Sequence, residues 1–353
     1  MEGLTFGTRL NIDYLIRDRK AYSNTIYGYS VPNGGELSDS HSNNVTYVIQ
    51  NYLDYNWALN DNHVFDFKVL QEYQTNRATS LSASGENFPD AGLFYLNNAG
   101  APVAVGGSYN DWHVGAYLAA VHYVGFGGKY VADLTYRREG NSRFGPDNRW
   151  GDFYSVGAAW NIHKEDFMGS SFFDELKLRV GYGEVGNVNG LGDYRFLTRY
   201  TGSTSTANYQ FGNSFYQTYR PEPLNEELRW EIGRTTNFGV DFAVLDNRLS
   251  GSLNYYIRQT KDLIAFSSVD PFTNFGNRVD KNIGDMENKG VEIMLNATPV
   301  VSDNFEWSIG YNIAFNDNTI TNLPFDQPTG GISGGVGNNV QLHTQGQVPN
   351  SFF

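Results

Sequence analysis

The sequence has no cysteine, and this absence excludes disulfides, iron–sulfur clusters and thiolate zinc sites while leaving the cellular compartment open. It also lacks any run that approaches the roughly 18 to 20 apolar residues of a membrane helix. The nearest stretch, 114–128, is short, rich in glycine and interrupted by His122. The sequence therefore predicts no membrane-spanning helix.

Positive charge is also scarce. The 353 residues include 25 Lys and Arg against 38 Asp and Glu, which gives a net charge of -13. Nucleic-acid binding needs basic surface that displaces counterions, so no nucleic-acid partner is expected. No signal peptide is visible either, because Met1 leads almost directly into an alternating segment, and we expect the natural N-terminus to be missing from this sequence.

Aromatic residues, in contrast, make up 15% of the chain, and many follow a period of two. The pattern is clearest around 137–160, which reads RREGNSRFGPDNRWGDFYSVGAAW. The alternating apolar residues before and after its central loop are Tyr130, Ala132, Leu134 and Tyr136, then Tyr154, Val156, Ala158 and Trp160. A period of two predicts strands, and the Gly, Asn, Asp and Pro between them predict a hairpin turn.

The apolar face of this predicted hairpin has aromatics near both ends and smaller residues between. This distribution is typical of strands that cross a bilayer between two aromatic girdles. We therefore predict a lipid-facing girdle that comprises Tyr130, Tyr136, Tyr154, Trp160 and Trp307. The facing of the strand at 112–124 stays open, because Val114, Leu118 and Val124 compete with Tyr117, Val121 and Tyr123 for one face.

Along the whole chain we expect about eleven strands whose connections alternate in length. The short connections are expected at 60–62, 125–128, 163–174, 244–248 and 299–304, and the long ones at 16–43, 77–110, 138–150, 186–227 and 261–286. Short periplasmic turns and long extracellular loops are typical of an outer-membrane barrel. The predicted fold class is thus all-β, an antiparallel transmembrane β-barrel with long extracellular loops.

The odd strand number indicates that the barrel is incomplete. Bacterial single-chain barrels have an even number of strands, and an open sheet in lipid leaves backbone edges unpaired. Residues 1–353 are therefore expected to form one arc of a larger barrel, as part of a single barrel domain, with the remainder in missing sequence or in another chain.

Five separated blocks resemble the SusC/RagA family of TonB-dependent outer-membrane transporters. They are the stretches 137–160, 174–187, 225–264, 283–300 and 305–323, which follow the order of the middle-to-late part of that barrel. GQVPNSFF at 346–353 is similar to the start of another family block. The resemblance implies a plug domain and a barrel of 22 strands. The plug domain and the ends of the barrel are expected to be absent from this sequence.

The resemblance also implies a function. Such a transporter imports oligosaccharides or peptides through the outer membrane of a Gram-negative, Bacteroidota-type bacterium, and a SusD-like surface lipoprotein forms its lid. The TonB complex energises it through the plug segment. The barrel arc contacts outer-membrane lipid, carries no chemistry and needs no cofactor. The alternatives are a passive barrel scaffold in another envelope assembly and, more remotely, a soluble glycan-binding module.

Motifs for catalysis or metal binding are weak. Gly181 to Gly186 fits the dinucleotide pattern GxGxxG, but the residues after it cannot start a helix cleanly, so a β-bulge or loop shoulder is expected. The six histidines show no metal-ligand spacing; they are His41, His63, His113, His122, His163 and His343. No serine stands out as the nucleophile of a hydrolase. We predict a protein that is not an enzyme.

Two groups of residues are candidates for contacts with the lid or the substrate. At the hairpin tip these are Arg138, Arg143, Phe144 and Arg149, and in the long loop they are Tyr209, Tyr216 and Tyr219. For the tip we favour a salt-bridged loop folded over the barrel wall, because paired charges in glycine-rich loops often rigidify them. The tyrosines suit stacking on sugar rings or gripping peptides as well as they suit girdle or lid packing.

Overall fold

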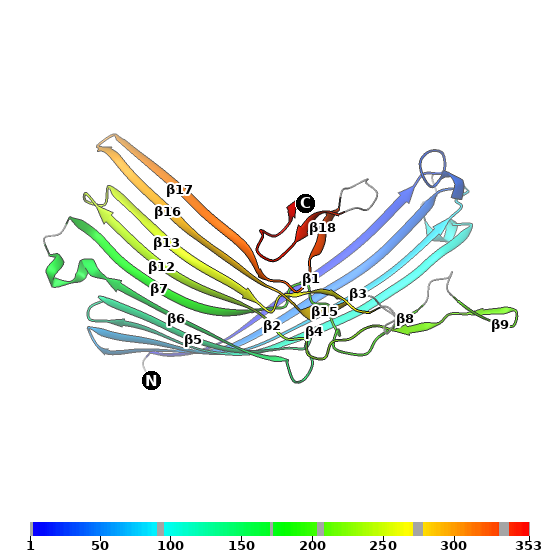
Figure 1. The fold of residues 1–353 in the computed structure, drawn as a ribbon, viewed down its shortest axis with the longest axis horizontal. Helices are drawn as coiled ribbons and strands as arrows, with labels where there is room; N and C mark the ends of the chain where they lie inside the picture. The colour runs from blue at the N-terminus through cyan, green and yellow to red at the C-terminus, as the bar shows by residue number, and fades with distance from the viewer. Residues whose placement is uncertain are drawn as a thin grey trace. The chain divides into compact units, whose positions relative to one another are not determined.

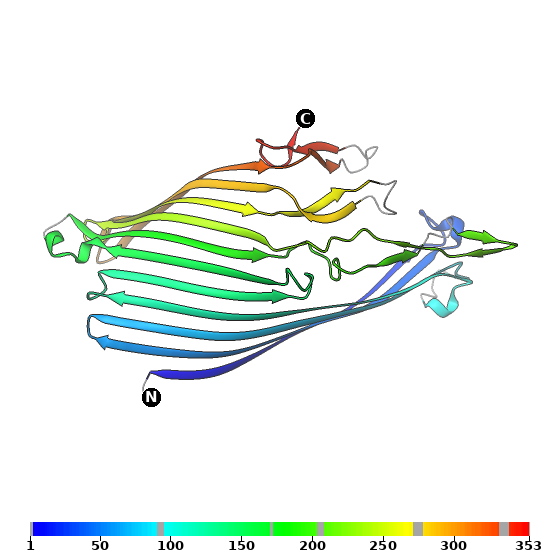
Figure 2. The ribbon, with the colours of Figure 1, turned by 60° about the horizontal axis from the view of Figure 1, so that its bottom comes forward.

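The computed structural model describes residues 3–89, 95–169, 172–202, 208–270, 278–331 and 339–352. Its main feature is one sheet of eleven strands that follow one another in chain order (Figures 1 and 2). The strands are β1 (Leu4–Ser23), β2 (Glu36–Asn60), β3 (His63–Glu86), β4 (Ala101–Gly125), β5 (Tyr130–Asn141), β6 (Trp150–Asn161), β7 (Phe173–Asn187), β12 (Glu231–Val244), β13 (Leu249–Lys261), β16 (Asp285–Ser302) and β17 (Phe305–Asn322). The predicted all-β, antiparallel sheet of about eleven strands is confirmed.

Smaller elements occupy the connections. The short strands form three separate pairs and one three-stranded sheet: β8 (Tyr200–Gly202) with β11 (Tyr219–Pro221), β9 (Tyr209–Phe211) with β10 (Ser214–Tyr216), β14 (Ile264–Ser268) with β15 (Arg278–Asn282), and β18 (Gln327–Gly331) with β19 (Asn339–His343) and β20 (Ser351–Phe352). The 3₁₀ turns are η1 (Val31–Asn33), η2 (Leu96–Asn98), η3 (Ile162–Lys164) and η4 (Asp166–Met168). Within the described ranges, no helix has the length and apolar character that crossing a membrane requires.

Residue contacts divide the chain into two compact units, one of 1–6, 52–70 and 117–353 and the other of 7–51 and 71–116. In the second unit, the prediction of long loops at 16–43 and 77–110 is wrong over much of their length, because strands occupy these residues. β1 continues to Ser23, and β2 already begins at Glu36. Polar side chains pair across these strands, as Lys20 does with Asp39 at 3.4 Å. The strands therefore continue beyond the residues that show apolar alternation.

In the first unit, seven strands form what we call the wall: β5, β6, β7, β12, β13, β16 and β17. The register of these strands places the alternating apolar residues on one face. Across the wall, the aligned residues include Leu134, Val156, Tyr182, Val180, Phe238, Tyr255, Val291 and Phe315. This face is open, with Leu134 57% and Val156 52% exposed. A continuous exposed apolar face of this size marks a surface that contacts something apolar.

The opposite face of the wall is small and polar. One row across four strands consists of Asp133, Gly157, Gly181 and Asn237. On the same face, the Arg179 guanidinium donates two hydrogen bonds of 2.7 Å to Asp241 and one of 2.9 Å to the Asn254 side chain. The wall therefore separates an apolar side from a polar side, as the period of two requires.

The strand at 112–124 now has a defined facing. Tyr123 lines a groove of the apolar face together with Tyr130 and Trp160. Its neighbour His122 points to the other side, where its Nδ1 lies 2.6 Å from an Asp133 carboxylate oxygen. The Tyr117–Val121–Tyr123 set therefore shares the apolar face of the wall.

Two further expectations need correction. Gly181 to Gly186 lies inside β7 in unbroken register with β12, so it is neither a bulge nor a loop shoulder; the register shift between these strands falls at Ala243 and Val244. The connection expected at 299–304 is largely strand, because β16 reaches Ser302 and accommodates Pro299 through a register shift after Ala297. Proline cannot donate to a strand ladder and is therefore tolerated at such irregularities.

The short-turn end of the wall holds its aromatics by polar contacts. Glu165 accepts hydrogen bonds from the Tyr130 hydroxyl at 2.8 Å and the Trp160 indole at 2.9 Å. Lys129 lies 3.1 Å from the same carboxylate. These bonds hold the pKa of Glu165 below its ordinary value, first through Trp160 and then through Tyr130 and Lys129. The turn before β5 uses Gly127 and Gly128 at positive φ, which side chains disfavour.

Candidate functional site: the loop assembly

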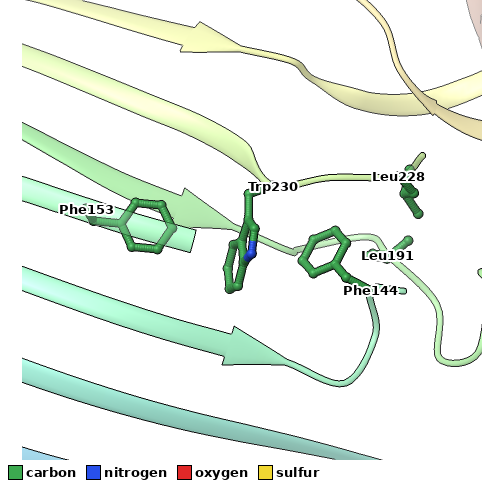
Figure 3. Packing of buried hydrophobic residues seen from close by; sticks show 5 residues of the cluster. All are labelled: Phe144, Phe153, Leu191, Leu228 and Trp230. Carbon is green, nitrogen blue, oxygen red and sulfur yellow. The ribbon is translucent and has the colours of Figure 1, made fainter. Parts of the chain in front are cut away.

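At the other end of the wall, two long connections share one apolar core, the β5–β6 loop and the β7–β12 connection. Phe144 comes from the β5–β6 loop, Leu191 from the segment after β7, and Leu228 and Trp230 from the segment before β12; Phe153 of β6 completes the cluster. Trp230 lies between Phe153 and Phe144 (Figure 3), with ring centroids 5.4 Å and 4.9 Å apart. All five are buried, and Phe144 and Leu228 are 0% exposed. We call these connections, together with β8, β11, β14 and β15, the loop assembly.

Polar contacts join the same loops around this core. The Trp230 indole donates a hydrogen bond of 3.2 Å to the Arg149 carbonyl. Arg143 Nε donates one of 2.8 Å to Asp193. The two partners of each bond belong to different connections, so the bonds fix the loops to one another. Buried polar groups that are paired in this way specify one arrangement of the loops.

The β14–β15 hairpin is attached through Asn282. Its amide donates to the carbonyls of Arg229 at 2.7 Å and Asp262 at 2.9 Å. Its side-chain oxygen accepts from the Arg229 backbone N–H at 2.9 Å. Nearby, the Asn225 amide donates to the Asp280 carbonyl at 3.0 Å. The hairpin is therefore a fixed part of the loop assembly.

A pocket of about 250 Å³ opens between the two hairpins of the loop assembly. Its charged lining comprises Arg195, Arg220, Glu222, Arg278 and Asp280, and its apolar lining includes Phe266 and Pro221. Arg195 Nε lies 3.4 Å from Asp280, while Arg199 and Thr201 both engage Glu222. Burial raises the pKa of Asp280, against the opposing effect of Arg195 and Arg199. The Thr201 hydrogen bond, aided by the nearby arginines, lowers the pKa of Glu222.

The structure distributes the predicted tip residues over different environments. Phe144 is fully buried and belongs to the apolar core, so it is not accessible for the contact proposed from the sequence. Arg143 and Arg149 are built into the loop assembly through the bonds above. Arg138 lies beyond the girdle, 3.5 Å from Asp152, with its guanidinium 5.6 Å from the centre of the Trp150 ring.

The predicted tyrosines lie apart from the tip. Tyr209 and Tyr216 face each other across the β9–β10 pair, and Tyr219 begins β11. All three are exposed. Four girdle residues pair across β5 and β6 on the apolar face, Tyr130 with Trp160 and Tyr136 with Tyr154. The fifth, Trp307 of β17, lies opposite Val300 of β16. Whether the three tip arginines or the tyrosines touch a lid or a ligand stays a prediction, and so does the contact of the girdle with lipid.

Sequence reasoning missed the charged pocket. Arg195, Glu222, Arg278 and Asp280 belong to segments that lie far apart in the chain, and none of them is part of a recognisable motif. The pairs β8–β11 and β14–β15 bring these segments together. Their mutual approach could not be read from local pattern.

A sheet with one apolar and one polar face, short turns at one end and long loops at the other is typical of the class of outer-membrane β-barrels. Residues 2–344 match the family model described as TonB dependent receptor-like, beta-barrel. The chain belongs to this family, and the predicted barrel class and the resemblance to SusC and RagA are confirmed.

Individual relatives agree with this assignment. The chain is 39% identical over 238 residues to the TonB-dependent receptor SusC of Bacteroides thetaiotaomicron, an alignment that covers 64% of this chain and 23% of SusC. It is 29% identical over 327 residues to the TonB-dependent receptor P3 of Formosa agariphila, covering 91% of this chain and 32% of that protein. The chain thus spans about a quarter to a third of these relatives.

Among solved structures, the fold matches that of the RagAB peptide transporter. The superposition has a TM-score of 0.85 at 23% sequence identity and covers 100% of this chain and 38% of the matched chain. At this identity the likeness supports the fold. Members of the family are outer-membrane β-barrels.

Proposed function

We propose that this chain forms the wall and part of the extracellular loops of a SusC-like importer in the outer membrane of a Bacteroidota-type bacterium. The proposed cargo is an oligosaccharide or a peptide, the lid is a SusD-like surface lipoprotein, and the TonB complex supplies energy through a plug segment. The observation that carries the proposal is the two-faced wall with a fixed loop assembly at its long-loop end.

Each part has a role that follows from its chemistry. The apolar face, with 57% exposure at Leu134, loses contact with water when it lies against lipid. The polar face, with Asp133, Arg179 and Asp241, suits a hydrated interior. The loop assembly offers exposed aromatics on β9, β10 and β11 and a charged pocket, which are the kinds of surface that recognise sugars, peptides or a lid. In this proposal transport requires no covalent chemistry from the chain.

The decisive experiment uses the intact protein in its own outer membrane. Affinity purification followed by mass spectrometry is expected to recover a SusD-like lipoprotein in stoichiometric amount. Uptake of fluorescent oligosaccharides and peptides by cells is expected to stop when the proton-motive force is dissipated. A barrel that assembles normally but supports no energy-dependent uptake and recovers no lipoprotein would instead be a passive scaffold, and the importer proposal would fail.

A further inference from the structure

The charged pocket of the loop assembly is lined by residues of two strand pairs, β8–β11 and β14–β15. In β14–β15, Phe266 lies opposite Asp280, and Arg278 lies opposite Ser268 one repeat further along. Residues at these positions share one face of the hairpin. In β8–β11, Arg220 lies opposite Thr201. All of these residues except Ser268 line the pocket.

The balance of charge around this pocket is positive. Arg195, Arg199, Arg220 and Arg278 contribute four positive charges, whereas Glu222 and Asp280 contribute two negative ones, a surplus of two. The chain as a whole carries -13, so the pocket is a local exception to the charge of the protein. A concave site with a surplus of one sign of charge favours ligands of the other sign.

The carboxylates of the pocket already have partners, and at least one arginine is available. Asp280 is engaged by Arg195, and Glu222 by Arg199 and Thr201. Arg278 is exposed and makes no ion pair with any residue in the described ranges. Phe266, 55% exposed, lies beside it on the same hairpin face. The pocket thus presents a guanidinium next to an aromatic ring.

We propose that this pocket binds one acidic unit of the cargo, through a carboxylate held by Arg278 and an adjoining apolar surface packed against Phe266. Guanidinium groups recognise carboxylates through paired, charge-assisted hydrogen bonds. The volume of about 250 Å³ lies below the roughly 300 to 1,000 Å³ of sites that enclose a whole drug-sized ligand. It therefore suits a single sugar acid or a single acidic amino acid, and the rest of the cargo lies outside it.

This inference deepens the proposed function and rests on it, because it names acidic glycans or peptides as the class of cargo. The carboxylate has two sources, a uronic acid and an acidic peptide. The probes that distinguish them are trigalacturonate and the peptide Gly-Glu-Gly, with maltotriose as the neutral reference.

The test measures binding of the three probes to the purified intact protein by isothermal titration calorimetry. Trigalacturonate or the acidic peptide is expected to bind in a salt-sensitive manner, and Arg278→Gln is expected to weaken that binding about tenfold or more. Arg278→Lys, which keeps the charge but loses the paired geometry, is expected to retain part of the affinity. The matched control is Arg248→Gln, an exposed arginine in the β12–β13 turn at the opposite end of the wall.

The source of the carboxylate follows from which acidic probe binds. The inference is overturned if neither acidic probe binds more tightly than maltotriose, or if Arg278→Gln and Arg248→Gln behave alike. Its failure differs from failure of the importer proposal. Energy-dependent uptake of neutral cargo without Arg278-dependent binding removes the inference alone, whereas Arg278-dependent binding without any uptake removes the importer proposal alone.

Discussion

The wall and the loop assembly use the same apolar side chains in opposite ways. In the wall, Leu134 and Val156 are 57% and 52% exposed, whereas in the loop assembly Phe144 and Leu228 are 0% exposed. The loops pack their apolar groups against each other, as a water-soluble protein does. The wall leaves its apolar groups to be covered by its surroundings. Internal packing therefore stabilises the loops, whereas backbone pairing and the proposed lipid contact stabilise the wall.

The largest effect is expected from Trp230→Ala, which removes the centre of the loop core. Loss of a buried tryptophan costs about 3–5 kcal/mol, and here it also removes the hydrogen bond to the Arg149 carbonyl. Hydrogen exchange in 141–149 and around Leu191 is expected to accelerate strongly, while exchange in β5 to β7 stays slow. Trp307→Ala, which truncates a half-exposed residue of the apolar face, is the control and is expected to leave the loops protected.

A second large effect is expected in the wall from Val180→Arg. Val180 lies in the middle of the apolar face between Ala158 and Phe238, and an arginine at the midplane of a bilayer costs about 2–4 kcal/mol. The fraction of folded barrel in membranes, read from heat-modifiable gel migration, is expected to fall. Asn237→Arg, one residue from Phe238 on the polar face, provides the contrast. Equal loss in both variants would contradict the assignment of the two faces.

A smaller effect is expected from Asn282→Ala. Asn282 makes three hydrogen bonds that attach the β14–β15 hairpin to the segments around Arg229 and Asp262. Leaving these groups unpaired costs about 1–3 kcal/mol. Limited proteolysis is expected to cut the hairpin sooner, without change in the wall. Asn213→Ala, in the exposed turn between β9 and β10, is expected to have little effect.

The smallest effect is a pH dependence confined to the loop assembly. Because burial raises the folded-state pKa of Asp280 above its unfolded value, the local free energy of unfolding decreases as pH rises between these two values. Glu222 acts in the opposite sense, because its pKa is lowered in the folded loops. The contribution of Glu222 to the free energy of unfolding is present above the pKa of the unfolded state and is lost as pH falls through the lowered pKa of the folded state.

Hydrogen exchange in the two hairpins over about pH 3 to 6, the range of ordinary carboxyl titration, tests this prediction. Asp280→Asn is expected to remove the loss of protection on raising the pH, and Glu222→Gln to remove the loss on lowering it. The wall provides the internal reference. A parallel pH response in β12 and β13 would mean that the effect does not originate in these two carboxyl groups.

The facing of the wall could be predicted from the sequence because a period of two is imposed by the backbone itself. Tyr130 opposite Trp160 and Leu134 opposite Val156 follow from alternation plus one short turn. The long strands beyond the apolar band could not be predicted in this way, since polar pairs such as Lys20 with Asp39 leave no periodic signal. Their ends were placed too early, and loops were expected instead.

The structure of the loop assembly could not be predicted from local sequence pattern, for a different reason. Arg143 was expected to pair within its own hairpin, yet its carboxylate is Asp193, fifty residues along the chain. Phe144 was a candidate for contact with the lid or the substrate, yet it packs in the apolar core with Trp230 and Leu228. Such contacts depend on how separate connections converge, and a single sequence does not report that convergence.

The β8–β11 pair has a consequence for how such a protein diversifies. Tyr200 and Pro221 lie opposite each other at its base, and the Arg199 backbone carbonyl accepts a hydrogen bond of 2.8 Å from the Glu222 N–H directly below. The exposed residues of β9 and β10 lie beyond this base, so their side chains can change while the contacts of the base are kept. Exchange of the β9–β10 pair between related chains would therefore change the exposed surface of the loop assembly and leave the base that holds it unchanged.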